Sequence, residues 1–143
     1  MARRAFACCL LFFCLAAPAW ADTVCHFINV GQGDAIWLAL DGGYDILVDG
    51  GKPAACPTVV AYLQSHGCDS VELLVATHPD ADHIGGLPAV LDAIPVTEAW
   101  LDLGDCSTAA CADLRAALLA QGVVTSTVQM GDTFVWGDVT LAV

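Results

Sequence analysis

Two histidines and two aspartates lie within six consecutive residues of this chain, 78–83, whose sequence is His-Pro-Asp-Ala-Asp-His. The preceding residues, 71–76, form an apolar run short enough for a buried strand, and residues 84–87 can begin a helix. The four polar side chains should therefore lie on a strand-to-helix loop, a usual place for chemistry in an α/β scaffold. Neighbouring carboxylates repel one another unless a cation lies between them, and the chain has only four Lys and Arg residues. We therefore expect a metal ion at this loop.

A simpler interpretation is that Asp80 and Asp82 cap the N-terminus of the following helix. One capping carboxylate is common, but capping does not explain two carboxylates together with two histidines. The spacing also suits metal ligation, because residues 78, 80 and 82 can point the same way in an extended loop while residue 83 turns into the helix. The two roles are compatible, and we predict that metal binding is the main one.

The first 21 residues have the composition of a signal peptide. Arg3 and Arg4 precede an uncharged apolar stretch, and residues 19–21 supply the small residues of a cleavage site. A membrane anchor is the alternative, but the apolar run is short for a span and contains Pro18. We therefore expect these residues to be removed, with no stable membrane anchor left, and the protein to be exported to the periplasm or secreted.

The charge of the remaining chain, residues 22–143, is strongly acidic. It contains all 16 Asp and Glu residues, against Lys52 and Arg115 as its Lys and Arg residues. Such a surface is a poor general binder of nucleic acid, because phosphates would be repelled, but it attracts divalent cations. Acidity that only keeps an exported protein soluble is an equally good explanation.

Five cysteines follow the predicted signal peptide: Cys25, Cys56, Cys68, Cys106 and Cys111. In an oxidising compartment we expect disulfides rather than a redox or zinc centre, and the chain has no pair spaced as CxxC. Cys56 with Cys68 would bracket one helix, and Cys106 with Cys111 would close a small loop. The odd number leaves at least one thiol over, and Cys25 is the candidate.

Hydrophobic periodicity predicts a β-meander followed by alternating helices and strands. The meander consists of three strands joined by glycine-containing turns at 31–34 and 41–43. A later helix, 108–121, should place Leu114, Leu118 and Leu119 on one face. This order indicates a layered α/β (α+β) domain with a mixed sheet. The expected strands are 23–30, 35–40, 44–48, 71–76, 96–101, 123–128, 133–136 and 139–143, and the expected helices are 57–66, 84–93 and 108–121.

Residues 77–87, Thr-His-Pro-Asp-Ala-Asp-His-Ile-Gly-Gly-Leu, resemble the metal-binding motif of the metallo-β-lactamase (MBL) superfamily. Asp80 stands where many members have histidine, and in this respect the chain is similar to the ComEC-type branch of competence proteins and small exported relatives. Two upstream elements also resemble the family and occur in the same order, Asn-Val-Gly-Gln-Gly-Asp-Ala at 29–35 and Leu-Val-Asp-Gly-Gly at 47–51. The resemblance runs from about Val24 to the C-terminus and implies an αββα sandwich.

The resemblance also implies a role for each polar residue of the motif. His78 and Asp80 would bind a first metal ion, and Asp82 and His83 a second, with Asp82 as the catalytic residue. Asp49 would lie at a strand end beneath the metals and support the site, although stabilising the glycine turn that follows it is an equal alternative. The two ions would be Zn²⁺ or Mn²⁺, and Mg²⁺ is a further candidate because a carboxylate at position 80 is a harder ligand than an imidazole.

The implied function is that of a hydrolase in which two metal ions hold a hydroxide that attacks a phosphorus or carbonyl centre. We therefore expect an exported metallo-hydrolase of phosphodiester bonds, nucleic acid among the possible substrates, or of another ester or amide bond. Family members take further ligands, two histidines among them, from later segments, whereas this chain has no histidine after His83. Residues 22–143 are thus expected to form the first half of the sandwich, with the C-terminal half absent. The alternatives are a truncated non-catalytic remnant and a metal-binding or interaction module that forms oligomers through its exposed half-sandwich.

Overall fold

A mixed six-stranded sheet forms the centre of the computed structural model, which describes residues 23–136 and 139–143. The predicted signal peptide lies outside the described residues. The strands follow one another in the order β1-β2-β3-β4-β5-β6, antiparallel from β1 to β3 and parallel from β3 to β6. The strands are β1 (Val24–Phe27), β2 (Ile36–Leu40), β3 (Tyr44–Val48), β4 (Val71–Ala76), β5 (Val96–Leu101) and β6 (Val124–Ser126).

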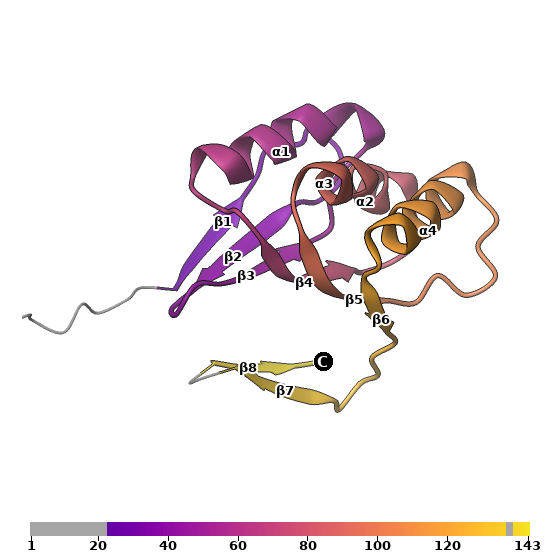
Figure 1. Ribbon diagram of the computed structural model, residues 1–143. Helices are drawn as coiled ribbons and strands as arrows, with labels where there is room; N and C mark the ends of the chain where they lie inside the picture. Colours follow the sequence, from indigo (N-terminus) through magenta and orange to yellow (C-terminus); the bar gives the residue numbers. More distant parts are fainter. Residues whose placement is uncertain (1–22, 137–138) are drawn as a thin grey trace, which may run out of the picture.

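The helices of the described residues lie on one face of this sheet (Figure 1). Every parallel crossover contains a helix, and because the strand order is sequential and crossovers share one hand, the helices are placed on the same side. None of the helices in the described part of the chain is both long enough and apolar enough to span a membrane. The helices are η1 (Pro53–Ala55), α1 (Cys56–Ser65), α2 (Ala81–Ile84), α3 (Leu87–Ala93) and α4 (Ala109–Gln121).

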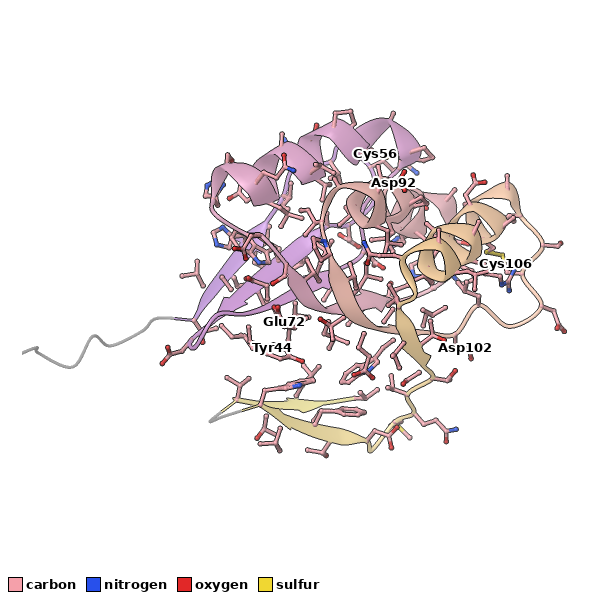
Figure 2. All side chains as sticks on the ribbon, in the orientation of Figure 1. Tyr44, Cys56, Glu72, Asp92, Asp102 and Cys106 are labelled. Atoms are coloured by element: carbon pink, nitrogen blue, oxygen red, sulfur yellow. A yellow bond between two sulfur atoms is a disulfide. The ribbon has the colours of Figure 1, made fainter. Side chains whose placement is uncertain are left out.

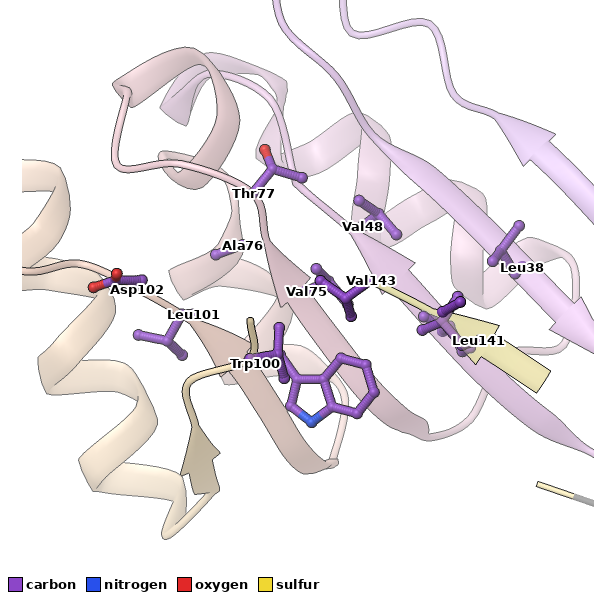
Figure 3. A pocket seen from close by; sticks show the side chains of 13 residues that line it. Leu38, Val48, Val75, Ala76, Thr77, Trp100, Leu101, Asp102, Leu141 and Val143 are labelled. Carbon is purple, nitrogen blue, oxygen red and sulfur yellow. The ribbon is translucent and has the colours of Figure 1, made fainter. Parts of the chain in front are cut away.

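A hairpin of two further strands, β7 (Thr133–Trp136) and β8 (Val139–Ala142), lies against the other face of the sheet (Figure 1). Its inner side is aromatic, and the Phe134 ring lies 3.8 Å from the Trp100 ring, measured between centroids. Between hairpin and sheet is an apolar pocket of about 370 Å³, with Trp100 and Leu141 among its walls and Thr77 at its edge (Figure 3). The layers are therefore helices, sheet and hairpin.

The predicted fold class, a layered α/β domain with a mixed sheet and an N-terminal meander, is confirmed. The predicted single helix over 84–93 is wrong, because the chain forms two helices that separate at Gly85 and Gly86. A Cβ atom at Gly86 would lie 1.9 Å from the carbonyl oxygen of Gly50, and the Gly86 amide donates to Gly51 O at 2.9 Å. Two glycine pairs thus pack backbone against backbone, which bends the chain at this point.

In α4, the prediction that three leucines share one face is wrong for Leu119. Leu114 and Leu118 are buried, at 0% and 4% exposed, whereas Leu119 is 83% exposed. Residues four apart lie on the same face of a helix, but the next residue is rotated by about 100°. Leu118 therefore follows Leu114 into the core, and Leu119 faces solvent.

Replacing Leu114 by alanine is expected to lower the free energy of unfolding by about 2–5 kcal/mol, because a fully buried side chain leaves a cavity. The matched control Leu119→Ala should change it by less than about 0.5 kcal/mol. Urea unfolding followed by tryptophan fluorescence measures both values. Equal losses in the two variants would contradict the placement of α4.

The predicted cysteine pairings are confirmed for one pair and wrong for the other. Cys106 and Cys111 form a disulfide that closes the loop before α4. Cys56 and Cys68 are free, as is Cys25, so three thiols of the described residues are unpaired. Figure 2 shows Cys56 among the helices and Cys106 beside α4. Cys56 begins α1 and Cys68 follows its end, so about 15 Å of helix separates them, whereas a disulfide needs Cα atoms within about 7 Å.

Candidate metal centre

The site is built where β3 and β4 end. Asp49 follows β3 and Thr77 follows β4, and these strands are parallel neighbours, so both residues emerge at the same edge of the sheet. The Asp49 amide donates to Val75 O at 2.8 Å. Asp49 has φ 57°, in the left-handed region that aspartate tolerates better than most residues. Ligand sites of α/β sheets commonly lie outside the carboxyl ends of parallel strands, which is the position found here.

Asp49 is a buried carboxylate, 1% exposed, that accepts three hydrogen bonds. Its Oδ1 accepts from the Thr77 amide at 2.9 Å, and its Oδ2 accepts from the Thr77 hydroxyl at 2.6 Å and from His83 Nδ1 at 2.8 Å. One donor atom each from Asp49, His78 and His83 lie within 4.8 Å of one another, the spacing of a metal site. Because its oxygens already accept three hydrogen bonds, Asp49 is better suited to orienting His83 than to binding an ion directly.

The hydrogen bonds also determine which nitrogen of each histidine is free. The single hydroxyl proton of Thr77 is donated to Asp49, so the Thr77 oxygen must accept from His78 Nδ1, which lies 3.0 Å away. His83 likewise donates its Nδ1 proton to Asp49. In its neutral form, each imidazole then has an unprotonated Nε2. This is the usual arrangement of metal-bound histidines, in which the second nitrogen donates to a carboxylate or another oxygen.

The two imidazoles lie together and a carboxylate is next to them. The ring centroids of His78 and His83 are 3.8 Å apart, and His78 Nε2 is 3.5 Å from Asp80 Oδ2. Asp80 occupies the N-cap position of α2 but makes no side-chain capping bond, so its carboxylate, 72% exposed, is free. Two neutral imidazoles and a free carboxylate are a donor set that suits zinc and other divalent ions. The residues present therefore fit a metal ion.

Asp82 lies on the other side of His83, in the first turn of α2. Its Oδ2 accepts a hydrogen bond from Gln32 Nε2 at 3.2 Å, and Gln32 in turn accepts from Lys52 Nζ. The loop that carries Gln32 packs tightly on this turn, because a Cβ atom at Gly33 would lie 1.8 Å from Asp82 O. Side chains from two other segments, those of Gln32 and Lys52, thus help to position the Asp82 carboxylate.

The pKa values of His83 and Asp82 are shifted in opposite directions. Burial lowers the pKa of His83, but the hydrogen bond that His83 donates to Asp49 and the charges of Asp49, Asp82 and Asp34 outweigh it, so the pKa is raised above its usual value. The pKa of Asp82 is lowered, first by a hydrogen bond from its own backbone amide and then by Gln32, His83 and Lys52. The Asp82 carboxylate is therefore charged and available to a cation at neutral pH.

The structure thus brings His78, His83 and Asp49 into one cluster, with Asp80 next to His78 and Asp82 in the first turn of α2 outside that cluster. Sequence reasoning missed three contributors, Thr77, Gln32 and Lys52. Gln32 and Thr77 both occur in segments that resemble the family, which was the available signal. The Asp34 carbonyl accepts from the Gly51 amide at 2.8 Å, and the Asp34 carboxylate lies 3.8 Å from His83 Nδ1.

The sequence of this chain is similar to parts of known proteins. Part of the chain is 36% identical over 73 residues to a hydroxyacylglutathione hydrolase of Synechococcus sp. (strain CC9605), covering 51% of this chain and 28% of the relative. Another part is 38% identical over 96 residues to recombination protein 2 of Haemophilus influenzae, covering 62% of this chain and 11% of the relative. The chain therefore spans less than a third of the length of either relative.

Solved structures share the fold. A metallo-beta-lactamase from Cronobacter sakazakii, carrying mutations in its HARLDQ motif, superposes with a TM-score of 0.60 at 18% identity, over 82% of this chain and 49% of that protein. The SMB-1 metallo-beta-lactamase gives a TM-score of 0.58 at 20% identity. At such identities the likeness speaks for the fold alone. The sequence profile of the metallo-beta-lactamase superfamily matches residues 28–143, which is most of the chain. This chain belongs to the metallo-beta-lactamase superfamily.

Proposed function

We propose that this chain provides metal-binding residues of an exported, ComEC-type metallo-hydrolase that cleaves phosphodiester bonds. The observation that carries the hydrolase proposal is the pair of neighbouring imidazoles that both donate from Nδ1, to Thr77 and to Asp49, so that Nε2 of each can bind an ion, with Nε2 of His78 beside the Asp80 carboxylate. Superfamily membership supports a metal-dependent hydrolase. Similarity to a recombination protein supports nucleic acid or another phosphodiester as substrate. Export rests on the composition of residues 1–21.

Each residue has a defined task in this proposal. His78 and Asp80 would hold one divalent ion, Zn²⁺ or Mn²⁺ with Mg²⁺ as a further candidate, and His83 and Asp82 a second. Bound divalent ions supply Lewis acidity and activate water at neutral pH. Asp49 keeps the His83 proton on Nδ1, and Thr77 does the same for His78. The positions of both imidazoles are therefore set before any ion binds.

Thioester hydrolysis is the second candidate substrate chemistry. The similarity to hydroxyacylglutathione hydrolases favours it, at 36% identity in one relative and 35% in a second from Synechococcus sp. (strain CC9902). Phosphodiesters and thioesters both require an activated water and a stabilised oxyanion, so one metal centre can serve either. Turnover of a glutathione thioester in preference to a phosphodiester would select this candidate.

His83→Ala is expected to lower the affinity of the chain for Zn²⁺ by at least tenfold, because it removes a ligand and leaves the buried Asp49 carboxylate without its imidazole partner. The matched control is His66→Ala. His66 is an exposed histidine after α1 whose Nδ1 donates to Tyr62 O, and it makes no contact with the site. Isothermal titration calorimetry on the metal-free proteins compares the variants. Equal loss of Zn²⁺ affinity in both would contradict the proposed site.

The activity itself is tested with the full chain loaded with Zn²⁺ or Mn²⁺. Hydrolysis of bis(p-nitrophenyl) phosphate that requires the ion and is lost in Asp82→Ala supports the phosphodiesterase. Metal uptake without turnover of any phosphodiester or thioester would contradict the hydrolase and leave a non-catalytic metal-binding module. A stable oligomer in size-exclusion chromatography would instead support an interaction module that pairs through an exposed half-sandwich.

A further inference from the structure

Lys52 is positioned at the edge of the metal centre by the backbone on both sides of it. It follows the Gly50-Gly51 turn, where the Gly51 amide donates to Asp34 O and the Gly51 carbonyl accepts from the Gly86 amide. Its own carbonyl accepts from the Ala55 amide at 2.8 Å. The backbone of Lys52 is thus held on the same glycine frame that carries the metal-binding loop. Its side chain reaches from there to Gln32, which contacts Asp82.

Among the described residues, Lys52 is the Lys or Arg residue whose charged group is available to bind a substrate. These residues include one other Lys or Arg, Arg115, and its guanidinium donates to the carbonyls of Cys106 and Gly104 at 2.7 and 3.0 Å. Arg115 is therefore engaged in holding the loop before α4. An ammonium group has three protons, and the Lys52 ammonium gives one to Gln32, which is an exposed contact. Two N–H donors remain for another partner.

Carboxylates near Lys52 offset its positive charge as long as no metal ion is bound to them. Asp82 is linked to Lys52 through Gln32, and Asp34 lies 3.8 Å from His83 Nδ1, so carboxylates make this region acidic. Divalent ions held by the predicted ligands would neutralise the carboxylates, and Lys52 would then be an uncompensated positive charge at the rim. An anionic substrate repelled by the acidic surface as a whole would be attracted at this one place.

We propose that Lys52 is a substrate-recognition residue that binds an anionic oxygen of the substrate, such as a phosphoryl oxygen, beside the metal centre. The proposal rests on the proposed hydrolase function and deepens it by assigning the residue that selects for anionic substrates. The ammonium of lysine is a common binder of phosphate as a point charge. A carboxylate, such as those of glutathione, offers the same chemistry, and the test distinguishes the two.

The competing role for Lys52 is purely positional, holding Gln32 so that Gln32 holds Asp82. Three substrates separate the roles: bis(p-nitrophenyl) phosphate, S-lactoylglutathione and the uncharged p-nitrophenyl acetate. In Lys52→Gln, kcat/KM for an anionic substrate should fall about tenfold or more relative to kcat/KM for the neutral ester, mainly through KM, because a charged hydrogen bond is lost. Lys52→Arg should restore most of it, and added salt should reduce the difference. The anionic substrate that shows the larger change identifies the group bound.

A binding measurement keeps the test independent of turnover. Calorimetric titration of inorganic phosphate into the Zn²⁺-loaded full chain should give at least tenfold weaker binding in Lys52→Gln than in the natural chain. Gln32→Ala serves as the matched variant, because it disturbs Asp82 but leaves the ammonium in place.

If Gln32→Ala and Lys52→Gln have the same effect on all substrates and on phosphate, Lys52 is only a positioning residue and the proposal is overturned. It is equally overturned if phosphate affinity is unchanged in Lys52→Gln. Failure of the hydrolase proposal looks different, since no substrate would then be turned over by the natural chain.

Discussion

Replacing Asp49 by alanine is expected to lower the free energy of unfolding by about 2–4 kcal/mol and to weaken Zn²⁺ binding by about 10- to 100-fold. The loss of stability follows because the buried carboxylate accepts from the Thr77 amide, the Thr77 hydroxyl and His83 Nδ1, and its removal leaves these donors without their partner. The φ of 57° adds strain when alanine occupies the position. The loss of affinity follows because neither imidazole is then held with its proton on Nδ1.

Two variants control this experiment. Asp45→Ala removes a carboxylate within β3 that accepts from Trp37 Nε1 at 2.7 Å, and it should lower stability while leaving Zn²⁺ affinity unchanged. Asp49→Asn keeps the shape of the side chain and suits the left-handed backbone, so its stability should fall between those of the natural chain and Asp49→Ala. Urea unfolding and zinc calorimetry give the two quantities. Unchanged zinc affinity in Asp49→Ala would show that Asp49 only stabilises the turn.

Gly33→Ala is expected to lower kcat about 100-fold, if the chain is a hydrolase, and to destabilise the fold by about 2–4 kcal/mol. The added Cβ atom would lie 1.8 Å from Asp82 O and 2.8 Å from Asp82 C, so either the loop at 29–34 or the first turn of α2 must move. Both movements displace the Asp82 carboxylate from Gln32. Part of the destabilisation comes from the positive φ of 100°, which alanine adopts at a cost of about 1–2 kcal/mol.

Gly31→Ala isolates the contact from the backbone strain. Gly31 also has a positive φ, 78°, but a Cβ atom there would meet nothing within 4 Å. It should therefore show the strain alone, with a destabilisation of about 1–2 kcal/mol and near-normal metal binding. Thermal unfolding and zinc titration of the two variants, run side by side, measure the difference. Indistinguishable behaviour of the two would mean that the loop does not press on the metal-binding turn.

The elements that sequence reasoning predicted well are those that local periodicity determines. The apolar runs of β3, β4 and β5 and the long α4 follow from short-range patterns, and so does the motif at 78–83 as a strand-to-helix loop. The break at Gly85 and Gly86 was not predictable in this way, because its cause is the Gly50-Gly51 turn more than thirty residues earlier. A pairing of Cys56 with Cys68 fitted the residue count, but the length of α1 prevents it.

The candidate site was predictable to a similar degree. Residue types and spacing pointed to His78, Asp80, Asp82 and His83, since those side chains are neighbours in the chain. The bonds that prepare them come from residues far apart in sequence: Asp49 is 34 positions from His83, and Gln32 is 50 positions from Asp82. Such contacts depend on the order of strands in the sheet, which no local pattern contains. The resemblance to a family supplied the hint for Asp49, but not the tautomers of the histidines.

Main-chain hydrogen bonds hold the loop at residues 78–83 in place. The Gly50 amide donates to His83 O at 2.8 Å, the Gly86 amide donates to Gly51 O at 2.9 Å, and the His83 amide donates to Asp80 O at 2.9 Å. Because the side chain of Asp80 takes no part in these bonds, exchange of that residue carries little folding penalty. A substitution at position 80 can therefore change the ligand atom that the loop offers while these main-chain hydrogen bonds stay in place.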